Sequence, residues 1–371
     1  MIDEKRLARQ KSILRDWSSA GCRGTLEACT GFGKTYTAIL AIQALNAQQP
    51  GESTLVFVPT IHLKKQWEDQ VSELSNVTVM VVNSAVKQTW NVNLLILDEI
   101  HNYATSTFGT IFQQVSYKKV LGLTATVARQ DGNDYLLRQK APIVATVKLE
   151  EALREGYVSP FRVLNVPVYL NDTDRDNYLE LSRNFSYYFS KFGNDFGQAM
   201  NCLKSDQACE NFARRSAADA DKVKVWAINF NRTFSESVDF ANAVTEQLPL
   251  ESVAYSSKMP AKKRRQALEQ FNTGKARIIN TARALDEGFD VPGVELAIIS
   301  SGSSSPRQDV QRTGRAIRFV EGKVGYIVNL YMPDTQDEKW MRKRQKNSTN
   351  IQHVQSLDQA IEIIGGITTT L

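Results

Sequence analysis

The segment ACTGFGKT at residues 28–35 has the residue types that bind the phosphates of a nucleotide. Its glycines let backbone N–H groups curve around phosphate oxygens, because no side chain stands in the way. Lys34 can reach the β- and γ-phosphates as a point charge, and the hydroxyl of Thr35 can bind Mg²⁺. The loop residues that we expect to hold a nucleotide are Thr30, Gly31, Phe32, Gly33, Lys34 and Thr35.

This loop lies in the setting that phosphate binding requires. The short strand GTLEA precedes it and the helix YTAILAIQAL follows it, so the N-terminus of the helix adds its dipole. The usual first glycine of this Walker A pattern is Ala28 here. Taken alone, the segment could also be a structural glycine turn, so a second motif has to support the nucleotide site.

A pair of carboxylates supplies that second motif. LLILDEIH at residues 94–101 is an apolar strand that ends in Asp98 and Glu99. At the carboxyl edge of a sheet, Asp98 can hold Mg²⁺ through water, and Glu99 can orient and deprotonate the attacking water. The two carboxylates could instead be a solvated strand end without a role. The Walker A loop that precedes this strand argues against that interpretation. Together the two motifs predict the hydrolysis of a nucleoside triphosphate.

Short apolar runs alternate with amphipathic stretches along most of the chain, which is the pattern of parallel α/β sheets. The runs that we expect to form strands of a first lobe are 54–59, 77–82, 93–98 and 119–125, with a helix over 61–74. A second series comprises 222–230, 252–257, 276–282, 294–300 and 323–331, with a helix over 261–271. The sequence therefore predicts two α/β lobes of similar size.

The chain divides into four segments on this basis. The first lobe covers residues 1–148, a connector covers 149–221, the second lobe covers 222–335 and a tail covers 336–371. The connector is rich in charged and aromatic residues and is predicted to be mostly helical. The tail is predicted to form one or two helices around a polar break.

The aromatic residues of the connector leave two interpretations open. They could stack on bases or wedge a duplex apart. More commonly, such a stripe is the buried face of a helix hairpin. The residues concerned are Tyr178, Phe185, Tyr187, Tyr188, Phe189, Phe192 and Phe196.

The composition narrows the class of protein without naming a partner. With 371 residues, of which 42% are hydrophobic and 23% charged, the chain can bury a full core. Its net charge of +5 permits a polyanionic partner but does not require one. The four cysteines are too few and too scattered for a disulfide scaffold. The sequence has no secretory signal pattern and no run of about 20 apolar residues, so we expect a cytoplasmic protein that does not engage a membrane.

Three motifs in their order along the chain carry a resemblance to a known family. DEIH at 98–101, LTAT at 123–126 and QRTGRAIR at 311–318 together resemble the superfamily 2 helicases and translocases, over most of the chain except the connector and the tail. The resemblance implies two RecA-like lobes with ATP and Mg²⁺ bound in the cleft between them. RQDG at 129–132 and LDEGFDVP at 285–292 resemble the repair-helicase branch of the XPB, RadD and UvsW types, which implies DNA rather than RNA as the partner.

The same resemblance implies roles for residues of the first lobe. Gln10 resembles the glutamine that reads the adenine edge, and Pro59 and Thr60 resemble the residues that touch a phosphate of the tracking strand. The residues that would link the ATP site to the nucleic-acid site are His101, Thr124 and Thr126.

In the second lobe the resemblance implies two further motifs. Within NTARALDEGFDVP, Thr281 would lie near a nucleic-acid phosphate, Gly288 near the nucleotide and Asp290 near the ribose. Within QRTGRAIR, Gln311 would lie near the γ-phosphate and the water, and the two arginine fingers would be Arg315 and Arg318.

The spacing of the two arginines fits that role on physical grounds. Arg315 and Arg318 are three positions apart, so on a helix both face the same way. Arginines supplied from the opposite lobe neutralise charge on the transferring phosphoryl group only when the cleft is closed. Alone, the segment could also be a basic, solvated helix face.

The function predicted from these residues is an ATP-dependent DNA helicase or translocase that works as a monomer. Three alternatives stay open: a DNA translocase that never separates strands, an RNA helicase, and a regulatory ATP switch with little turnover. The presence of Glu99 and both candidate fingers argues against the switch, because a pure switch has no need of a hydrolytic set.

Overall fold

The computed structural model describes residues 4–82, 89–103, 111–126, 134–191, 249–256, 259–281, 294–299, 324–346 and 350–365, together with residues 193 and 246. Several predictions lie outside these residues. They are the strand over 222–230, the RQDG segment at 129–132, the side chains of Phe185, Tyr188, Phe189, Phe192 and Phe196, and the site residues Gly288, Asp290, Gln311, Arg315 and Arg318.

The first lobe is built on a six-stranded parallel sheet in the order β3-β2-β4-β5-β1-β6. Its strands are β1 (Arg23–Ala28), β2 (Thr54–Val58), β3 (Val77–Val81), β4 (Trp90–Asp98), β5 (Val115–Thr124) and β6 (Ile143–Val147). All four strands predicted for this lobe are confirmed, with ends that shift by up to four residues. The arrangement is the RecA-like lobe that the resemblance implied.

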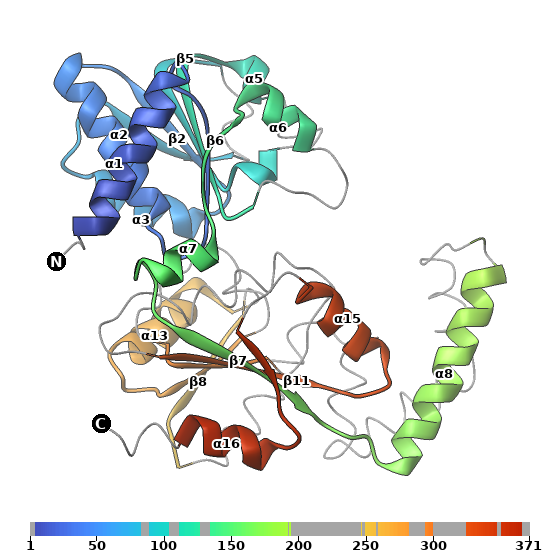
Figure 1. The fold of residues 1–371 in the computed structure, drawn as a ribbon. Helices are drawn as coiled ribbons and strands as arrows, with labels where there is room; N and C mark the ends of the chain where they lie inside the picture. The colour runs from blue at the N-terminus through green and yellow to red at the C-terminus, as the bar shows by residue number, and fades with distance from the viewer. Residues whose placement is uncertain are drawn as a thin grey trace.

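Helices cover both faces of this sheet (Figure 1). On one face lie α1 (Glu4–Ser19), α2 (Lys34–Gln48) and α3 (Ile61–Val71), and on the other lie α5 (Ile111–Gln114) and α6 (Asp134–Lys140). Successive residues of a strand point to opposite faces. In β4, therefore, Leu94 and Ile96 join the core under α1, α2 and α3, whereas Leu95 and Leu97 join the core under α5 and α6. Burial on both faces explains why the strands read as continuous apolar runs.

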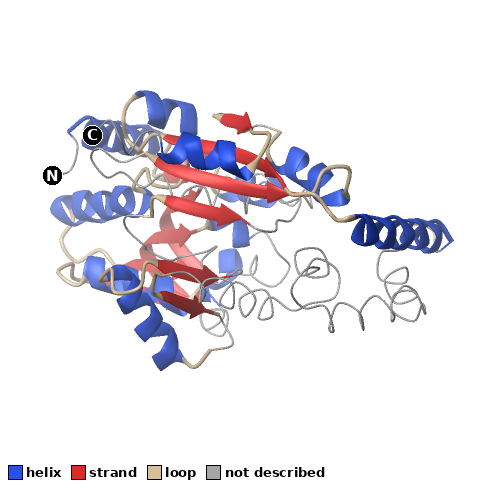
Figure 2. Cartoon of the chain, turned by 90° about the horizontal axis from the view of Figure 1, so that it is seen from below, coloured by secondary structure: helices blue, strands red, loops and turns tan. Residues whose placement is uncertain are grey.

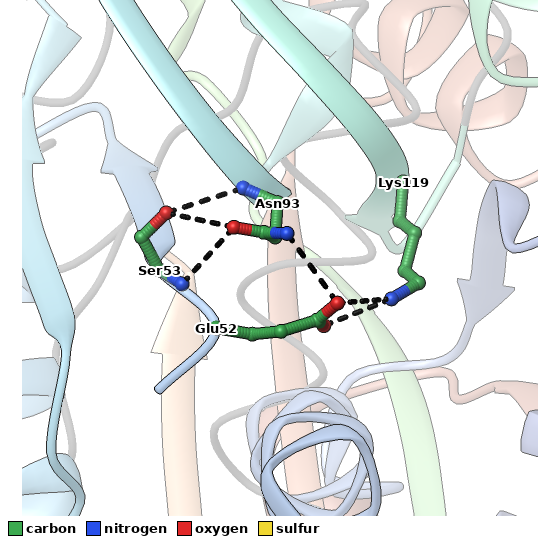
Figure 3. Close-up of polar contacts among 4 residues, drawn as sticks. All are labelled: Glu52, Ser53, Asn93 and Lys119. Carbon is green, nitrogen blue, oxygen red and sulfur yellow. Dashed lines mark hydrogen bonds and ion pairs between the residues drawn. The ribbon is translucent and has the colours of Figure 1, made fainter. Parts of the chain in front are cut away.

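A polar cluster just before the amino end of β2 joins this strand to β4 and β5, away from Asp98 (Figure 3). Lys119 Nζ donates to both carboxylate oxygens of Glu52, at 2.9 and 2.8 Å. Asn93 Nδ2 donates to Glu52 Oε1 at 3.4 Å, and Ser53 Oγ donates to Asn93 Oδ1 at 3.1 Å. Because Glu52 is buried, its charge needs these partners. The cluster fixes the register of β2, β4 and β5, and it thereby helps to position the loops at the opposite ends of these strands.

The second lobe contains a parallel sheet in the order β10-β11-β7-β12 and a separate parallel pair, β8 and β9. The strands are β7 (Phe161–Pro167), β8 (Ser252–Tyr255), β9 (Ile278–Thr281), β10 (Leu296–Ile299), β11 (Gly325–Tyr331) and β12 (Ile351–His353). The helix α13 (Ala261–Asn272) lies against β8 and β9. The strands predicted over 252–257, 276–282, 294–300 and 323–331 are thereby confirmed, as is the helix over 261–271.

The connector differs from its prediction in one important respect. Residues 161–167 form β7, which lies between β11 and β12 in the second sheet and pairs with β11 along its whole length (Figure 1). The expectation of a mostly helical connector is wrong for this stretch. The polar residues Arg162 and Asn165 interrupt its apolar pattern, and Asn165 is buried only because its amide bonds to Gln345 and Asn329. The domain boundaries themselves stay a prediction.

The tail contains α15 (Gln336–Arg344) and α16 (Leu357–Gly365), which agrees with the predicted one or two helices, and β12 lies between them. The strand β12 was not predicted, because three residues are too short to show a period. Val354 and Ala360 pack with Leu164, Val166 and residues of β11 in one core cluster. The tail is therefore part of the core of the second lobe.

The 20-residue helix α8 (Asp172–Lys191) projects away from the rest of the structure in both views (Figures 1 and 2). At its base, Tyr178 is buried and its hydroxyl accepts a hydrogen bond from the backbone N of Gln336 at 2.8 Å. Near its far end, Tyr187 is 61% exposed. These two aromatic residues thus differ, with Tyr178 in the core and Tyr187 on the surface. No helix in the described part of the chain is long and apolar enough to cross a membrane.

Candidate nucleotide site

Four segments with predicted roles follow the carboxyl ends of neighbouring strands in the first sheet. The loop 28–35 follows β1, Pro59 and Thr60 follow β2, Glu99 follows β4, and Thr126 follows β5. Since all these strands are parallel, their carboxyl ends lie at one edge of the sheet. Ligands of open α/β sheets bind at this edge.

The glycine loop has the backbone that a phosphate cradle requires. Gly31 and Gly33 have φ angles of 90° and 97°, a region that residues with a Cβ rarely adopt. The helix α2 begins at Lys34, and in the described part of the chain no side-chain hydrogen bond caps its N-terminus. A helix N-terminus in this condition attracts anions.

Gln10 lies directly against this loop. Its Nε2 donates to the backbone oxygens of Phe32 and Gly33, at 3.4 and 3.3 Å. A Cβ on Gly33 would lie only 2.8 Å from this Nε2, so the loop and the glutamine are fitted to each other. The Oε1 of Gln10 is buried and accepts no hydrogen bond from the described residues. A buried acceptor of this kind suits a ligand that brings its own N–H donor.

Lys34 lies within the loop and is available to a ligand. Its Nζ donates to the backbone oxygen of Ala28 at 3.0 Å. Burial raises the pKa of the neighbouring Cys29 thiol to about 11, although the charge of Lys34 opposes this rise. Cys29 is therefore a protonated thiol at neutral pH and cannot compete for the lysine as a charged partner.

Asp98 is a buried carboxylate at the end of β4. Burial raises its pKa, and the indole N–H of Trp67, the charge of Lys34 and the backbone N–H of Glu99 all oppose the rise. Trp67 Nε1 donates to Asp98 Oδ2 at 2.8 Å, and the backbone N of Glu99 donates to Oδ1 at 3.0 Å. The bonds favour the charged form, which is the form that a cation needs.

Glu99 has an unusual backbone conformation. Its φ is 49°, in the left-handed region, which costs a residue with a Cβ about 1–3 kcal/mol. Such strain is concentrated at functional sites. The conformation leaves the Glu99 side chain 20% exposed and puts its Oε2 3.4 Å from Nδ1 of His101.

His101 connects β4 with the segment after β5. Its Nδ1 lies 2.8 Å from the hydroxyl oxygen of Thr124, and both side chains are buried. The Thr124 hydroxyl donates to the backbone oxygen of Thr126 at 2.8 Å, so towards His101 it acts as an acceptor. We infer that the proton of the imidazole resides on Nδ1. The three residues that the resemblance grouped as a link are therefore joined by hydrogen bonds.

Gly122 makes room for the segment that carries the two carboxylates. A Cβ at this position of β5 would lie 2.5 Å from Cδ1 of Ile100 and 2.7 Å from Oγ1 of Thr25. Ile100 is fully buried and comes directly after Glu99.

We expect Gly122→Ala to destabilise the protein by about 1–3 kcal/mol, because it overpacks this contact. Urea unfolding measures the loss. Gly51→Ala is a comparison without a steric clash, since Gly51 has open space around it. Its φ of 92° would nevertheless strain the backbone of an alanine. Gly365→Ala, in α16 with open space and no positive φ, is the neutral control. A wild-type urea midpoint in Gly122→Ala would contradict this packing argument.

The predicted nucleic-acid residues occupy exposed or strand-end positions. Thr60 caps α3, since its side chain accepts a hydrogen bond from the backbone N of Leu63 at 3.2 Å. The next residue, Ile61, is 79% exposed. In the second lobe, Thr281 ends β9, and its buried hydroxyl has no hydrogen-bond partner among the residues that the structure describes. No hydrogen bond between described residues joins Thr281 to the edge that carries Asp98.

Contacts behind the loop lead towards the second lobe, and no sequence motif indicated them. Arg9, next to Gln10, forms an ion pair at 3.0 Å with Glu151 of α7 (Leu149–Arg154). The ring of Phe32 packs edge-on against Tyr157, with centroids 5.6 Å apart. Tyr157 lies between α7 and β7. The phosphate loop is thus in contact with the chain segment that connects the lobes.

Two known families match separate parts of the chain. The family described as "Helicase conserved C-terminal domain" matches residues 218–320, and the family described as "Type III restriction enzyme, res subunit" matches residues 5–89.

Individual proteins match over greater lengths. The "DNA 3'-5' translocase XPB2" of Sulfurisphaera tokodaii is 25% identical, over 92% of this chain and 86% of the relative. The "Putative DNA 3'-5' helicase Rad25" of Haloarcula marismortui is 26% identical over 90% of this chain, which spans only 54% of that relative. Among solved structures, S. cerevisiae Dbp5 bound to RNA and ADP BeF3 matches with a TM-score of 0.62 and 13% identity, covering 96% of this chain and 92% of the other. That last likeness concerns the fold alone.

Proposed function

We propose that this chain, an ATP-hydrolysing superfamily 2 helicase or translocase of the XPB type, moves along DNA by closing and opening a nucleotide cleft between its two lobes. The observation that carries the proposal is the edge of the first sheet. A glycine loop with a helix N-terminus lies there after β1, and a buried carboxylate followed by a strained glutamate comes from β4, the next strand but one.

The residues at this edge fit ATP with Mg²⁺. The loop offers backbone N–H groups and Lys34 to phosphates, and Gln10 keeps a buried acceptor for a donor such as an adenine amino group. Thr35 and Asp98 would hold Mg²⁺, which neutralises charge on the phosphates when it is bound. We assign Glu99 the role of orienting the attacking water and accepting its proton.

Movement requires that the ATP site and the DNA site be coupled. We assign Pro59, Thr60 and Thr281 to phosphates of the DNA strand, and the hydrogen-bonded set of His101, Thr124 and Thr126 to the link between the two sites. Backbone contacts of this kind carry little sequence information, and binding that depends on them weakens steeply with salt.

The second lobe would complete the site. We assign Gln311, Arg315 and Arg318 to the γ-phosphate and Gly288 and Asp290 to the nucleotide, on the basis of their motifs. Phe32 and Arg9 contact residues 149–157, the segment that leads into the second lobe. These contacts support the idea that this segment shifts when the glycine loop binds or releases a nucleotide. We further propose that the protein acts as a monomer in the cytoplasm, in the replication, recombination or repair of DNA.

Steady-state ATP hydrolysis tests this function directly. The rate is measured without nucleic acid and with single-stranded DNA, duplex DNA, branched DNA and RNA. We expect strong stimulation by DNA, above all by duplex or branched DNA, and its loss in Lys34→Ala, because the lysine contacts the phosphates. Lys140→Ala, which removes an exposed lysine of α6, is the matched control and should behave as the wild type.

The pattern of stimulation separates the alternatives. Stimulation by RNA alone would move the protein to the RNA helicases, and no stimulation by any nucleic acid would favour a switch. Displacement of a labelled strand separates a helicase from a translocase that leaves the duplex closed.

A further inference from the structure

Trp67 makes a contact with the carboxylate site that no motif predicts. It lies on α3, 31 positions before Asp98, and its Nε1 donates to Asp98 Oδ2 at 2.8 Å. The indole is 1% exposed and the carboxylate 5% exposed, so water does not screen this bond. Hydrogen bonds to a charged acceptor are among the stronger ones in proteins.

The two bonds to Asp98 fix its orientation. Trp67 occupies one lone pair of Oδ2, and the backbone N of Glu99, at 3.0 Å, occupies one lone pair of Oδ1. A carboxylate has about four such positions, so each oxygen keeps one for a further partner. The carboxylate is therefore held in place without being saturated, which is the condition of a group that has to hold the water shell of a cation.

We propose that Trp67 is a positioning residue that holds Asp98 in the orientation needed to retain Mg²⁺ with bound ATP. The inference rests on the proposed function and deepens it. Partners that orient a metal-binding group in this way commonly change metal affinity by about 10–100-fold when they are removed. Since α3 begins directly after Thr60, the same helix would connect a predicted DNA contact with the cation site.

A packing role alone is the competing explanation, because a buried indole N–H needs an acceptor wherever it lies. Trp17 offers the matched control. It is 3% exposed, belongs to the same core cluster, and its Nε1 donates to the backbone oxygen of Val120 at 2.9 Å. Trp17→Phe and Trp67→Phe each remove one buried indole hydrogen bond, but only the second one ends on Asp98.

The experiment measures the binding of a fluorescent ATP analogue to the full chain as the Mg²⁺ concentration is raised, with a parallel titration in EDTA. For Trp67→Phe we expect the Mg²⁺ concentration at half-maximal binding to rise about tenfold. Binding in EDTA should equal that of the wild type. Trp17→Phe should leave both quantities unchanged, and urea midpoints of both variants report any loss of folding.

Two further variants strengthen the test. In an Asp98→Ala background, Trp67→Phe should produce no additional change in the Mg²⁺ dependence, because the carboxylate through which it acts is gone. Trp67→His retains a ring N–H, and it should require less Mg²⁺ than Trp67→Phe. It also serves as the test variant if the phenylalanine protein does not fold.

Each outcome has a distinct meaning. An unchanged Mg²⁺ dependence in folded Trp67→Phe, or an equal change in Trp17→Phe, would overturn the positioning role. An additional change in the Asp98→Ala background would do the same. A wild-type protein that binds no analogue at any Mg²⁺ concentration would instead refute the proposed nucleotide site.

Discussion

Glu99→Gln should lower the DNA-stimulated rate of ATP hydrolysis about a thousandfold, which is the contribution typical of a positioned general base. Glutamine keeps the size of the side chain but cannot accept a proton from water. Glu99 adopts a φ of 49° and remains partly exposed, so the strained backbone presents a carboxylate at the edge of the sheet. Binding of ATP should persist, because the glycine loop and Lys34 are untouched.

Single-turnover hydrolysis and binding of a fluorescent analogue together measure this separation of binding from chemistry. Glu73→Gln, an exposed change of the same type just after α3, controls for the loss of one negative charge from the lobe. If Glu99→Gln lowered analogue binding as much as turnover, the residue would be structural or a ligand of the nucleotide. If turnover stayed within a few-fold of the wild type, another group would be the base.

Arg315→Ala and Arg318→Ala should each lower the same rate about 10³-fold or more. Among the described residues, the positive charge that acts on Asp98 is that of Lys34. The phosphates of ATP carry several negative charges, and more charge collects on the transferring group in the transition state. Mg²⁺ and Lys34 would neutralise part of this charge, and the motif at 311–318 is the candidate that the sequence offers for the rest.

Arg315→Lys refines this second prediction. It keeps the charge but loses the planar fork that binds phosphate oxygens in pairs, so it should recover only part of the rate. Lys323→Ala removes a positive charge five positions after the motif in the sequence and should leave turnover unchanged. The binding of DNA is measured in parallel, since a loss of DNA affinity equal to the loss of rate would assign these arginines to the DNA instead.

Local patterns predicted the first lobe well because its elements carry their own signals. The strands β2, β4 and β5 are apolar runs that are buried on both faces, and the glycine loop lies between a strand and a helix as phosphate binding demands. The motif residues that follow these strands meet at one edge because the sheet is parallel. Their roles stay predictions, although the positions of those described follow from the topology.

The features that the sequence could not predict depend on contacts between distant residues. An asparagine in an apolar run indicates a loop, so Asn165 argues against a strand here. In the structure it is buried in β7, where its amide bonds to Asn329 and Gln345. The bond between Trp67 and Asp98 joins residues that are 31 positions apart. The bonds between Gln10 and the glycine loop join residues that are 22 and 23 positions apart. No periodicity encodes such pairs, because the period of an element describes its own faces only.

The position of β7 in the second sheet has a consequence for folding during synthesis on the ribosome. Asn165 emerges 164 positions before Asn329 and 180 positions before Gln345, its two partners in the finished core. At about 5–20 residues per second, translation would leave β7 without these partners for roughly 8 to 36 s. The first lobe can fold during that interval, while an apolar strand of the second lobe stays open to wrong pairing. A chaperone that shields short extended segments would therefore raise the yield of this protein more than that of one whose sheets pair in the order of synthesis.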